Sequence, residues 1–360
     1  MKRITICRML FLAAMSLSAC SGVLPTGQEG SLSVVVSDGL ASKASDVTEL
    51  PFEKAVNQIQ LFLFEGSALR SYEMIDTRSQ TFPFTKTYPG IRAGEYQVFV
   101  VANAADLSFV ETPSDLLGTA VRLSECSLDV SRGFVMAGSA SVTVGGAAVQ
   151  APVALQRFAS RIRLVSVENH VPASYAGNGS VAVKGVFLAN ALGRWTLSGS
   201  GAASEWVNLG GRTAGREAAT ERSDFLVAEG QVHPAACRGQ VFRELDETLS
   251  RGTRKMFSAC CLYTFPNTVA TDHTGNTATE AYGAMTRLVV LAEVDGQDWW
   301  YPVTLFKDGK GPQRNMSYDV KLTLRATGSS DPNEPVGAGS LEAGISVKGW
   351  LTGVKYTETL

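Results

Sequence analysis

The sequence predicts an all-β protein of two tandem β-sandwich domains that follow a lipoprotein signal peptide. Three observations support this fold class. The chain has 360 residues with 35 glycines, and short Val-rich runs recur between turn-forming residues, while long segments of helical period are rare. The pattern of strands restarts near residue 155, which indicates a second sandwich. The apolar run near the N-terminus ends at a cysteine, which is typical of an exported bacterial lipoprotein.

Charge and hydropathy exclude some classes of partner. The 32 Lys and Arg residues nearly balance the 34 Asp and Glu residues, so the overall charge does not indicate binding to nucleic acid or to an anionic membrane surface. After the N-terminal run, no segment reaches the roughly 18 uninterrupted apolar residues of a membrane-spanning helix. We therefore expect a mature protein that is soluble apart from its lipid.

Residues 1–19 have the features of a signal peptide. Lys2, Arg3 and Arg8 form its positive end, and residues 9–19 are apolar apart from two serines. Small residues lead directly into Cys20, which predicts cleavage before Cys20 and acylation of its thiol. The lipid, palmitate in the simplest case, would hold the chain on a membrane by about 0.8 kcal/mol per buried methylene. The alternative is an ordinary signal peptide with Cys20 there by chance.

The segment that follows combines one strand with a basic loop. In residues 31–37, Leu32, Val34 and Val36 alternate with serines, which predicts a half-buried strand. Burial of these three side chains contributes roughly 5 kcal/mol before conformational entropy is subtracted. A polar, Gly-containing loop then ends at Lys43. Cleavage in that loop would remove the lipid and the strand together, so we interpret residues 20–43 as a lipidated propeptide with a removable first strand.

The rest of the chain divides into two predicted sandwiches, residues 44–154 and residues 155–350. Apolar runs bounded by turn residues predict the strands of both domains, at 59–64, 96–102, 134–136, 141–144, 162–167, 180–188, 255–265, 286–294, 299–306, 318–324 and 341–347. Residues 197–254 and 267–283 are rich in Gly, Ser, Thr and Ala, so we expect loops there.

The sequence does not decide whether the cysteines outside the signal peptide and the lipid site form disulfides. Cys126, Cys237, Cys260 and Cys261 remain, and four cysteines allow three pairings. Adjacent residues of a strand point to opposite faces, so Cys260 and Cys261 are poorly placed to bond to each other. Buried free thiols are as compatible with the sequence as disulfides. The spacing matches no zinc module, so no metal site is expected.

No catalytic constellation or cofactor motif is evident, and we expect a protein that is not an enzyme. The three histidines are far apart, and no zinc-protease helix motif, nucleophile elbow or phosphate-binding loop occurs. Residues 331–334 lack the glycine and terminal glutamate of a calcium loop, so a turn is the better interpretation. The aromatic run at 299–301 is a candidate sugar platform, but core packing of one tryptophan is the simpler expectation.

Several stretches together resemble the fimbrillin family of Bacteroidetes, the FimA and Mfa-type pilins. The first is residues 93–103, a glycine-led apolar strand that ends in Ala-Asn. The second is residues 155–164, with Arg157, Ala159 and Arg161. The most specific block is C-terminal: residues 301–303 and 314–324, then 328–335, then 345–350. Residues 197–283 lack a counterpart in this resemblance.

The resemblance implies a surface fimbria subunit with two Greek-key, transthyretin-like sandwiches. Members of the family reach the outer membrane as lipoproteins, and a trypsin-like protease then cuts the loop after the first strand. The empty groove accepts a strand from a neighbouring subunit, so the partners are copies of the chain and other fimbrial subunits, with host or bacterial surface ligands of an adhesive fimbrium. Cleavage here would follow Lys43 and expose Ala44. The best-known members carry Arg at that place, and Arg70 is the next basic candidate.

The donor implied by the resemblance is the tail of residues 351–360, in which Val354, Tyr356 and Leu360 share one face. A last strand that stays in its own sandwich is the alternative. A removable strand together with a tail favours a stalk subunit over a tip or anchor subunit. The competing class is a surface lipoprotein that binds polysaccharide through exposed aromatics, with Trp195, Trp206 and Trp300 as candidates.

Overall fold

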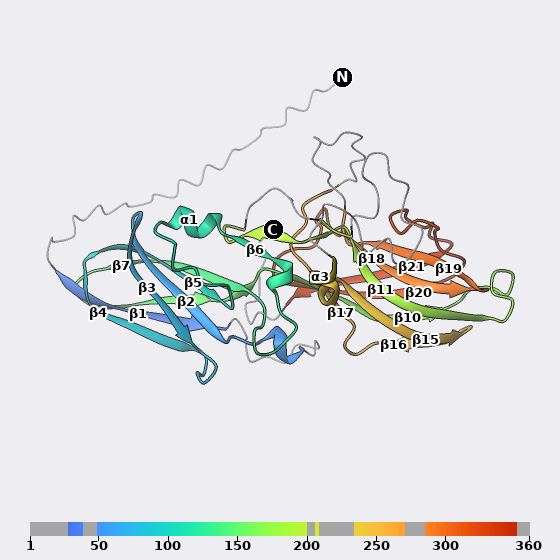
Figure 1. Ribbon diagram of the computed structural model, residues 1–360, viewed down its shortest axis with the longest axis horizontal. Helices are drawn as coiled ribbons and strands as arrows, with labels where there is room; N and C mark the ends of the chain where they lie inside the picture. The colour runs from blue at the N-terminus through green and yellow to red at the C-terminus, as the bar shows by residue number, and fades with distance from the viewer. Residues whose placement is uncertain (1–27, 39–48, 200–205, 209–233, 271–284, 351–360) are drawn as a thin grey trace, which may run out of the picture.

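The computed structural model describes residues 28–38, 49–199, 206–208, 234–270 and 285–350. The described residues are almost entirely β, and they form two groups of strands that lie end to end along the long axis (Figure 1). The predicted all-β sandwich fold is confirmed. No helix among the described residues is long and apolar enough to cross a membrane.

The first group of strands forms two sheets with a buried interior. One sheet has the order β4-β1-β8 and the other β3-β2-β5-β7-β9. The apolar faces of these sheets pack together. Buried positions alternate with less buried ones in β1 and β8, whereas β2 is buried at six consecutive positions. The strands are β1 (Glu29–Ser37), β2 (Gln58–Glu65), β3 (Ala68–Asp76), β4 (Phe84–Arg92), β5 (Gly94–Ala102), β7 (Met136–Val144), β8 (Ala148–Ala154) and β9 (Gln156–Arg157).

The second group also forms two sheets. One has the order β16-β10-β20-β21, with β17 also paired to β10, and the other has the order β15-β11-β18-β19. β10 and β20 run parallel, whereas most neighbouring pairs are antiparallel. The strands are β10 (Ser160–Asn169), β11 (Ser180–Ala189), β15 (Phe242–Ser250), β16 (Arg254–Met256), β17 (Cys261–Thr264), β18 (Arg287–Val294), β19 (Gln297–Thr304), β20 (Met316–Leu324) and β21 (Leu341–Gly349).

Short elements join the two groups. β6 (Ala120–Arg122) follows α1 (Pro113–Gly118) in the first half, and it pairs with β13 (Arg194–Thr196) of the second half. β12 (Ala191–Leu192) pairs with β14 (Trp206–Val207) beside them. The remaining elements are the 3-10 turns η1 (Pro51–Glu53) and η2 (Leu123–Glu125) and the helix α3 (Pro234–Val241). Most buried apolar residues of both halves belong to one contiguous cluster, so the halves share a core. A smaller, separate cluster in the second half comprises Phe187, Ala189, Phe242, Val289, Leu291 and Trp300.

Some expected elements differ from those observed. Residues 141–144 and 134–136 were expected as separate strands, but a single strand, β7, begins at Met136. The run 255–265 is interrupted between β16 and β17. Residues 197–254 contain α3 and β15 rather than loops alone. β15 escaped detection because its outward face carries acidic residues in a sequence, FRELDETLS, whose charges hide the alternation.

Candidate assembly site

β1 lies in the middle of its sheet. It pairs antiparallel with β4 and parallel with β8 along nearly its full length. Leu32, Val34 and Val36 each have no exposed surface, so the predicted inward face is confirmed. The hydroxyl of Ser33 on the other face lies 3.0 Å from that of Thr87. β1 is therefore integral to the sandwich although it belongs to the predicted propeptide.

The N-terminal end of β1 fits tightly against the neighbouring loop. A Cβ atom on Gly30 would lie 2.2 Å from the carbonyl oxygen of Gly145, so only glycine fits at this position. At the other end, the amide of Leu155 donates to the carbonyl of Ser37 over 3.0 Å. The strand thus ends beside residue 155, where the first sandwich leads into the second.

Several predicted site residues lie outside the described residues. These are the lipidation residue Cys20, the cleavage residues Lys43 and Ala44, and the donor residues Val354, Tyr356 and Leu360. The competing cleavage residue Arg70 is described. It lies within β3, and its guanidinium is 2.6 Å from the carboxylate of Glu65. Cleavage after Arg70 would have to occur inside a paired strand, which disfavours that site.

A buried polar cluster joins the two halves where β1 ends. We define this junction cluster as Glu49, Glu53, Arg157, Arg161, Tyr263 and Trp350. The Glu53 carboxylate accepts from the Arg161 guanidinium over 3.0 Å and from the Tyr263 hydroxyl over 2.7 Å. The side chains of Glu53 and Arg161 have no exposed surface. Glu53 comes from η1, whereas Arg161 and Tyr263 come from β10 and β17.

Arg157 connects the remaining members of the junction cluster. Its guanidinium donates to the Glu49 carboxylate over 3.1 Å and to the Trp350 carbonyl over 3.3 Å. The guanidiniums of Arg157 and Arg161 lie 4.8 and 5.4 Å from the centroid of the Trp350 ring, a favourable cation–π arrangement. Burial raises the pKa of Glu49 and lowers that of Arg157. Burial raises the pKa of Tyr263 as well.

The junction cluster lies beside both segments that the predicted function uses. Glu49 is the first described residue after the loop that contains Lys43, and Trp350 is the last described residue before the predicted donor tail. This cluster was not predicted from the sequence. Arg161 and Ile162 are neighbours on β10 and therefore point to opposite faces of the strand, yet both are fully buried. This part of β10 is covered on both faces, as expected where two domains meet.

The comparisons with known proteins bear on the first half of the chain most directly. Residues 30–156 match the family model described as "Major fimbrial subunit protein (FimA)", which begins within β1 and ends at β9. Over residues 30–156, the chain is similar to the FimA family. The resemblance noted in the sequence is thereby confirmed. No curated protein in the comparison matches the chain.

Solved structures share the fold of this chain over most of its length. A fimbrilin (FimA) from Porphyromonas gingivalis W83 superposes with a TM-score of 0.61 at 13% identity, covering 91% of this chain and 99% of the other. A putative cell adhesion protein from Bacteroides eggerthii DSM 20697 has a TM-score of 0.59 at 20% identity, with 92% and 99% covered. Another from Parabacteroides distasonis ATCC 8503 gives 0.58 at 18% identity, with 90% and 99% covered.

The tryptophans expected to bind polysaccharide in the competing hypothesis are buried in the protein. Trp195, Trp206 and Trp300 are 8%, 4% and 3% exposed, and the Trp300 ring packs edge-on against Phe187. A sugar ring needs an exposed aromatic face for stacking. The expectation that these residues form a glycan platform is therefore wrong, and the core-packing interpretation of Trp300 is correct.

The histidines and cysteines named in the sequence analysis form no reactive site among the described residues. His170 contacts the Glu168 carboxylate at 2.8 Å, while His233 and His273 lie outside the described residues. Cys126, Cys237, Cys260 and Cys261 are buried free thiols, and burial raises the pKa of Cys126 and of Cys260 to about 12. Within the described residues, no group of His, Cys, Asp and Glu is arranged to hold a metal ion.

Proposed function

We propose that this chain is a structural subunit of an adhesive cell-surface fimbria. It would be exported as a lipoprotein on Cys20, matured by a trypsin-like protease after Lys43, and polymerised by strand exchange. The observation that carries this proposal is the position of β1. It is the central strand of its sheet, with Leu32, Val34 and Val36 fully buried, and it belongs to the segment between the lipid site and Lys43.

Loss of β1 would leave a groove with two open edges. β4 and β8 would each present a row of unpaired N–H and C=O groups, because both pair with β1 in the intact chain. The apolar side chains beneath Leu32, Val34 and Val36 would also be exposed, at a cost of roughly 5 kcal/mol. Such a groove is a strong template for an incoming strand.

The proposed donor is the tail of residues 351–360 from a neighbouring subunit. Its apolar face, formed by Val354, Tyr356 and Leu360, would replace the buried face of β1. Ten extended residues span about 33 Å, and the nine residues of β1 span about 30 Å, so the tail is long enough for the groove. A contact in which one end of a subunit fills the groove of the next is heterologous, and its repetition builds a filament.

The junction cluster fixes the residue from which the proposed donor tail begins. Trp350 is held by its carbonyl contact with Arg157 and by its ring contacts with two guanidiniums. The tail therefore starts from a fixed point in the core of its own subunit. A fixed starting point lowers the conformational entropy lost when the tail orders in a neighbour.

The first test is the intact mass and N-terminal sequence of protein sheared from the cell surface. We expect an N-terminus at Ala44 without lipid, and oligomers that resist mild denaturation. The Lys43→Ala variant should retain the lipid and remain monomeric. Lys54→Ala, which changes an exposed lysine after η1, is the matched control and should mature and polymerise normally.

Deletion of residues 351–360 separates maturation from polymerisation. The deleted chain should be cut after Lys43 yet give no oligomer ladder. If all the surface protein keeps lipid on Cys20, the proposal of a polymerising subunit is wrong, and an anchor subunit or a glycan-binding lipoprotein is left. If the deleted chain polymerises as well as the wild type, the tail is not the donor.

A further inference from the structure

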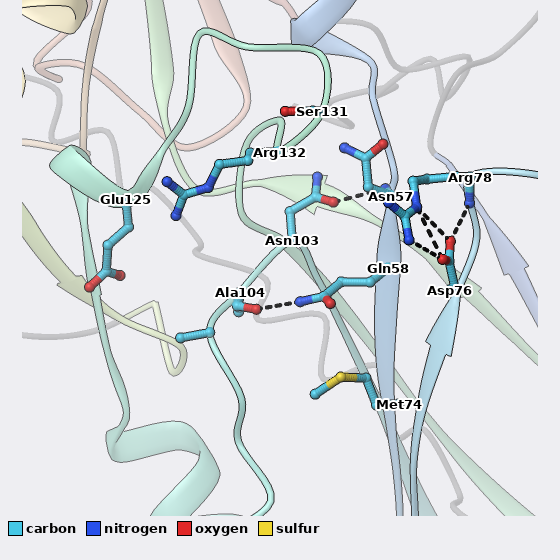
Figure 2. Close-up of a pocket in the computed structure, with 11 residues that line it drawn as sticks. Asn57, Gln58, Met74, Asp76, Arg78, Asn103, Ala104, Glu125, Ser131 and Arg132 are labelled. Atoms are coloured by element: carbon cyan, nitrogen blue, oxygen red, sulfur yellow. Dashed lines mark hydrogen bonds and ion pairs between the residues drawn. The ribbon is translucent and has the colours of Figure 1, made fainter.

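A polar pocket opens on the first sandwich at the end that faces the second. It has a volume of about 840 Å³, within the range of sites for small ligands. We call it the waist pocket. It is formed by the start of β2, the end of β3, the residues after β5 and the segment 125–132, with lining residues that include Asn57, Gln58, Met74, Asp76, Arg78 and Arg132 (Figure 2).

The wall of the waist pocket is held in place by Asn103. This residue has a positive φ of 57°, and its side-chain amide donates to the carbonyls of Ala55 and Phe134 over 2.7 and 2.8 Å. Its side-chain oxygen accepts from the amide of Asn57 over 2.9 Å. A Cβ on Gly133 would lie 2.8 Å from the Asn103 amide nitrogen. The pocket is therefore preorganised rather than formed by loose loops.

One cation of the waist pocket, Arg132, forms no salt bridge among the described residues. Asp76 accepts two bonds of 3.0 Å from the Nε of Arg78, which neutralises both groups. Glu125 accepts from the Arg122 amide over 3.2 Å and lies 3.9 Å from its guanidinium. Hydrogen bonds from Ser131 and the nearby charge of Arg132 lower the pKa of the Asp129 carboxyl, but the Arg132 guanidinium makes no hydrogen bond or salt bridge among the described residues. A cation without a salt bridge, close to acidic residues, suits one carboxylate group at a time and disfavours a doubly charged group such as a phosphate monoester.

The remaining polar atoms match hydroxyl groups. Asn57 and Gln58 donate through their side-chain nitrogens to the carbonyls of Val130 and Ala104 over 2.9 and 2.6 Å. Their side-chain oxygens have no donor within the described part of the chain, so both can accept from a ligand. The Asp76 carboxylate adds further acceptor capacity. A ligand with several hydroxyl donors would satisfy these oxygens.

One exposed apolar side chain lines the waist pocket and another lies close to it. Met74 belongs to the lining and is 45% exposed, while Val130, whose carbonyl accepts from the Asn57 side chain, is 55% exposed. Large apolar side chains that stay this exposed beside a polar cavity often mark a binding surface. They suit a ligand with C–H surface between its polar groups, which is the amphipathic character of a sugar ring.

We propose that the waist pocket binds a carboxylate-bearing saccharide. Arg132 would pair with the carboxylate, the oxygens of Asn57 and Gln58 would accept from hydroxyls, and Met74 would pack against the C–H face of the ring. Two sources carry this chemistry, sialylated glycans and uronic-acid oligosaccharides. The inference does not depend on strand exchange, because none of these residues belongs to β1 or to the tail.

The test is calorimetric titration of the full chain without its signal peptide. The probes are 3′-sialyllactose, trigalacturonic acid and, as the neutral control, lactose. We expect at least one acidic probe to bind ten-fold or more tighter than lactose. Arg132→Gln should weaken that binding ten-fold or more. Arg92→Gln removes the same charge from an exposed position at the far end of β4 and should leave the affinity unchanged.

The outcomes separate the proposal from its alternatives. Tighter binding of 3′-sialyllactose or of trigalacturonic acid identifies the source of the ligand. Equal binding of the acidic probes and lactose, or unchanged affinity in Arg132→Gln, overturns the role of the cation. Absence of binding by all three probes overturns the proposal. Folding of each variant is checked by thermal unfolding, so a loss of affinity in a stable variant reflects the pocket.

Discussion

The guanidinium of Arg161 lies 3.0 Å from the carboxylate of Glu53, and neither side chain has any exposed surface. The two residues are 108 positions apart and belong to different halves of the chain. Two charges are stable at such depth only when they are paired and hydrogen-bonded. The Tyr263 hydroxyl satisfies the second oxygen of Glu53. This ion pair therefore couples the two sandwiches.

Removal of one charge of this pair should destabilise the whole chain. We expect Glu53→Gln to lower the free energy of unfolding by about 3–5 kcal/mol, because the Arg161 guanidinium is left buried without its counter-ion. Urea denaturation with fluorescence detection measures the change. Glu65→Gln is the control, since it removes an exposed partner of Arg70 and should cost about 1 kcal/mol or less. Equal losses in the two variants would contradict the role of burial.

Shortening a buried side chain of β1 should lower the stability of the precursor but not that of the mature protein. In the precursor, Leu32→Ala should lower the free energy of unfolding by about 2–5 kcal/mol, because Leu32 is fully buried. If cleavage after Lys43 removes the strand, as proposed, the mature proteins should be identical in stability. Ser33→Ala on the opposite face is the control for the precursor. A persistent difference after cleavage would mean that β1 stays bound.

Asp319 should contribute to acid sensitivity. Burial raises the pKa of this carboxyl, but hydrogen bonds and charges from Arg163 and Lys348 outweigh burial, and its pKa lies below the usual value. A lowered pKa stabilises the fold above about pH 4, the pKa in the unfolded chain, and this stabilisation is lost as the pH falls through the folded-state pKa. Asp319→Asn should therefore cost roughly 1–3 kcal/mol at pH 7.

The pH dependence of stability tests whether ionised Asp319 stabilises the fold. The stability difference between wild type and Asp319→Asn, measured by urea denaturation, should shrink as the pH is lowered below 4. Asp298, which is partly exposed and pairs with Lys184 over 2.8 Å, is a comparison site where Asp→Asn should cost less. A difference that stays constant from pH 7 to pH 3 would refute the assignment to ionised Asp319.

The cysteines should be unreactive in the native protein. Cys126, Cys237, Cys260 and Cys261 are buried free thiols, and burial raises the pKa of Cys261 to about 11. Thiolate is the reactive form, so Ellman's reagent at pH 8 should label the folded chain slowly. In a chain that begins at Ser21, denaturant should release four thiols without a reductant. Recovery of fewer than four would reveal a disulfide.

Strands were predicted correctly where the apolar pattern within the strand is sufficient to identify it. β1 alternates apolar and polar residues, and β2 and β18 are continuous apolar runs, so each was recognised alone. β3, β4 and β8 were not predicted. They have exposed faces that mix charged, polar and small residues, and β4 contains Pro89 and Gly90. The sheet stabilises such strands through pairing with their neighbours, and pairing is not visible in a local pattern.

The candidate site divides in the same way. Leu32, Val34 and Val36 could be predicted because their burial follows from period-two alternation. The junction cluster and the waist pocket could not. Arg161 precedes Ile162 on β10, so a half-buried strand would expose it, yet the other half of the chain covers its side chain. Asn57 and Arg132 are far apart in the sequence, and only the loops after β5 and η2 bring them to one pocket.

The sequence by itself determined the all-β class and the inward face of β1, because these depend on composition and on short-range periodicity. The tertiary structure alone decided which strands flank β1, which charges are buried at the junction and which tryptophans are core. Each of these depends on contacts between residues far apart in the chain. Burial and strand pairing depend on two segments in contact, so neither can be predicted from one segment alone.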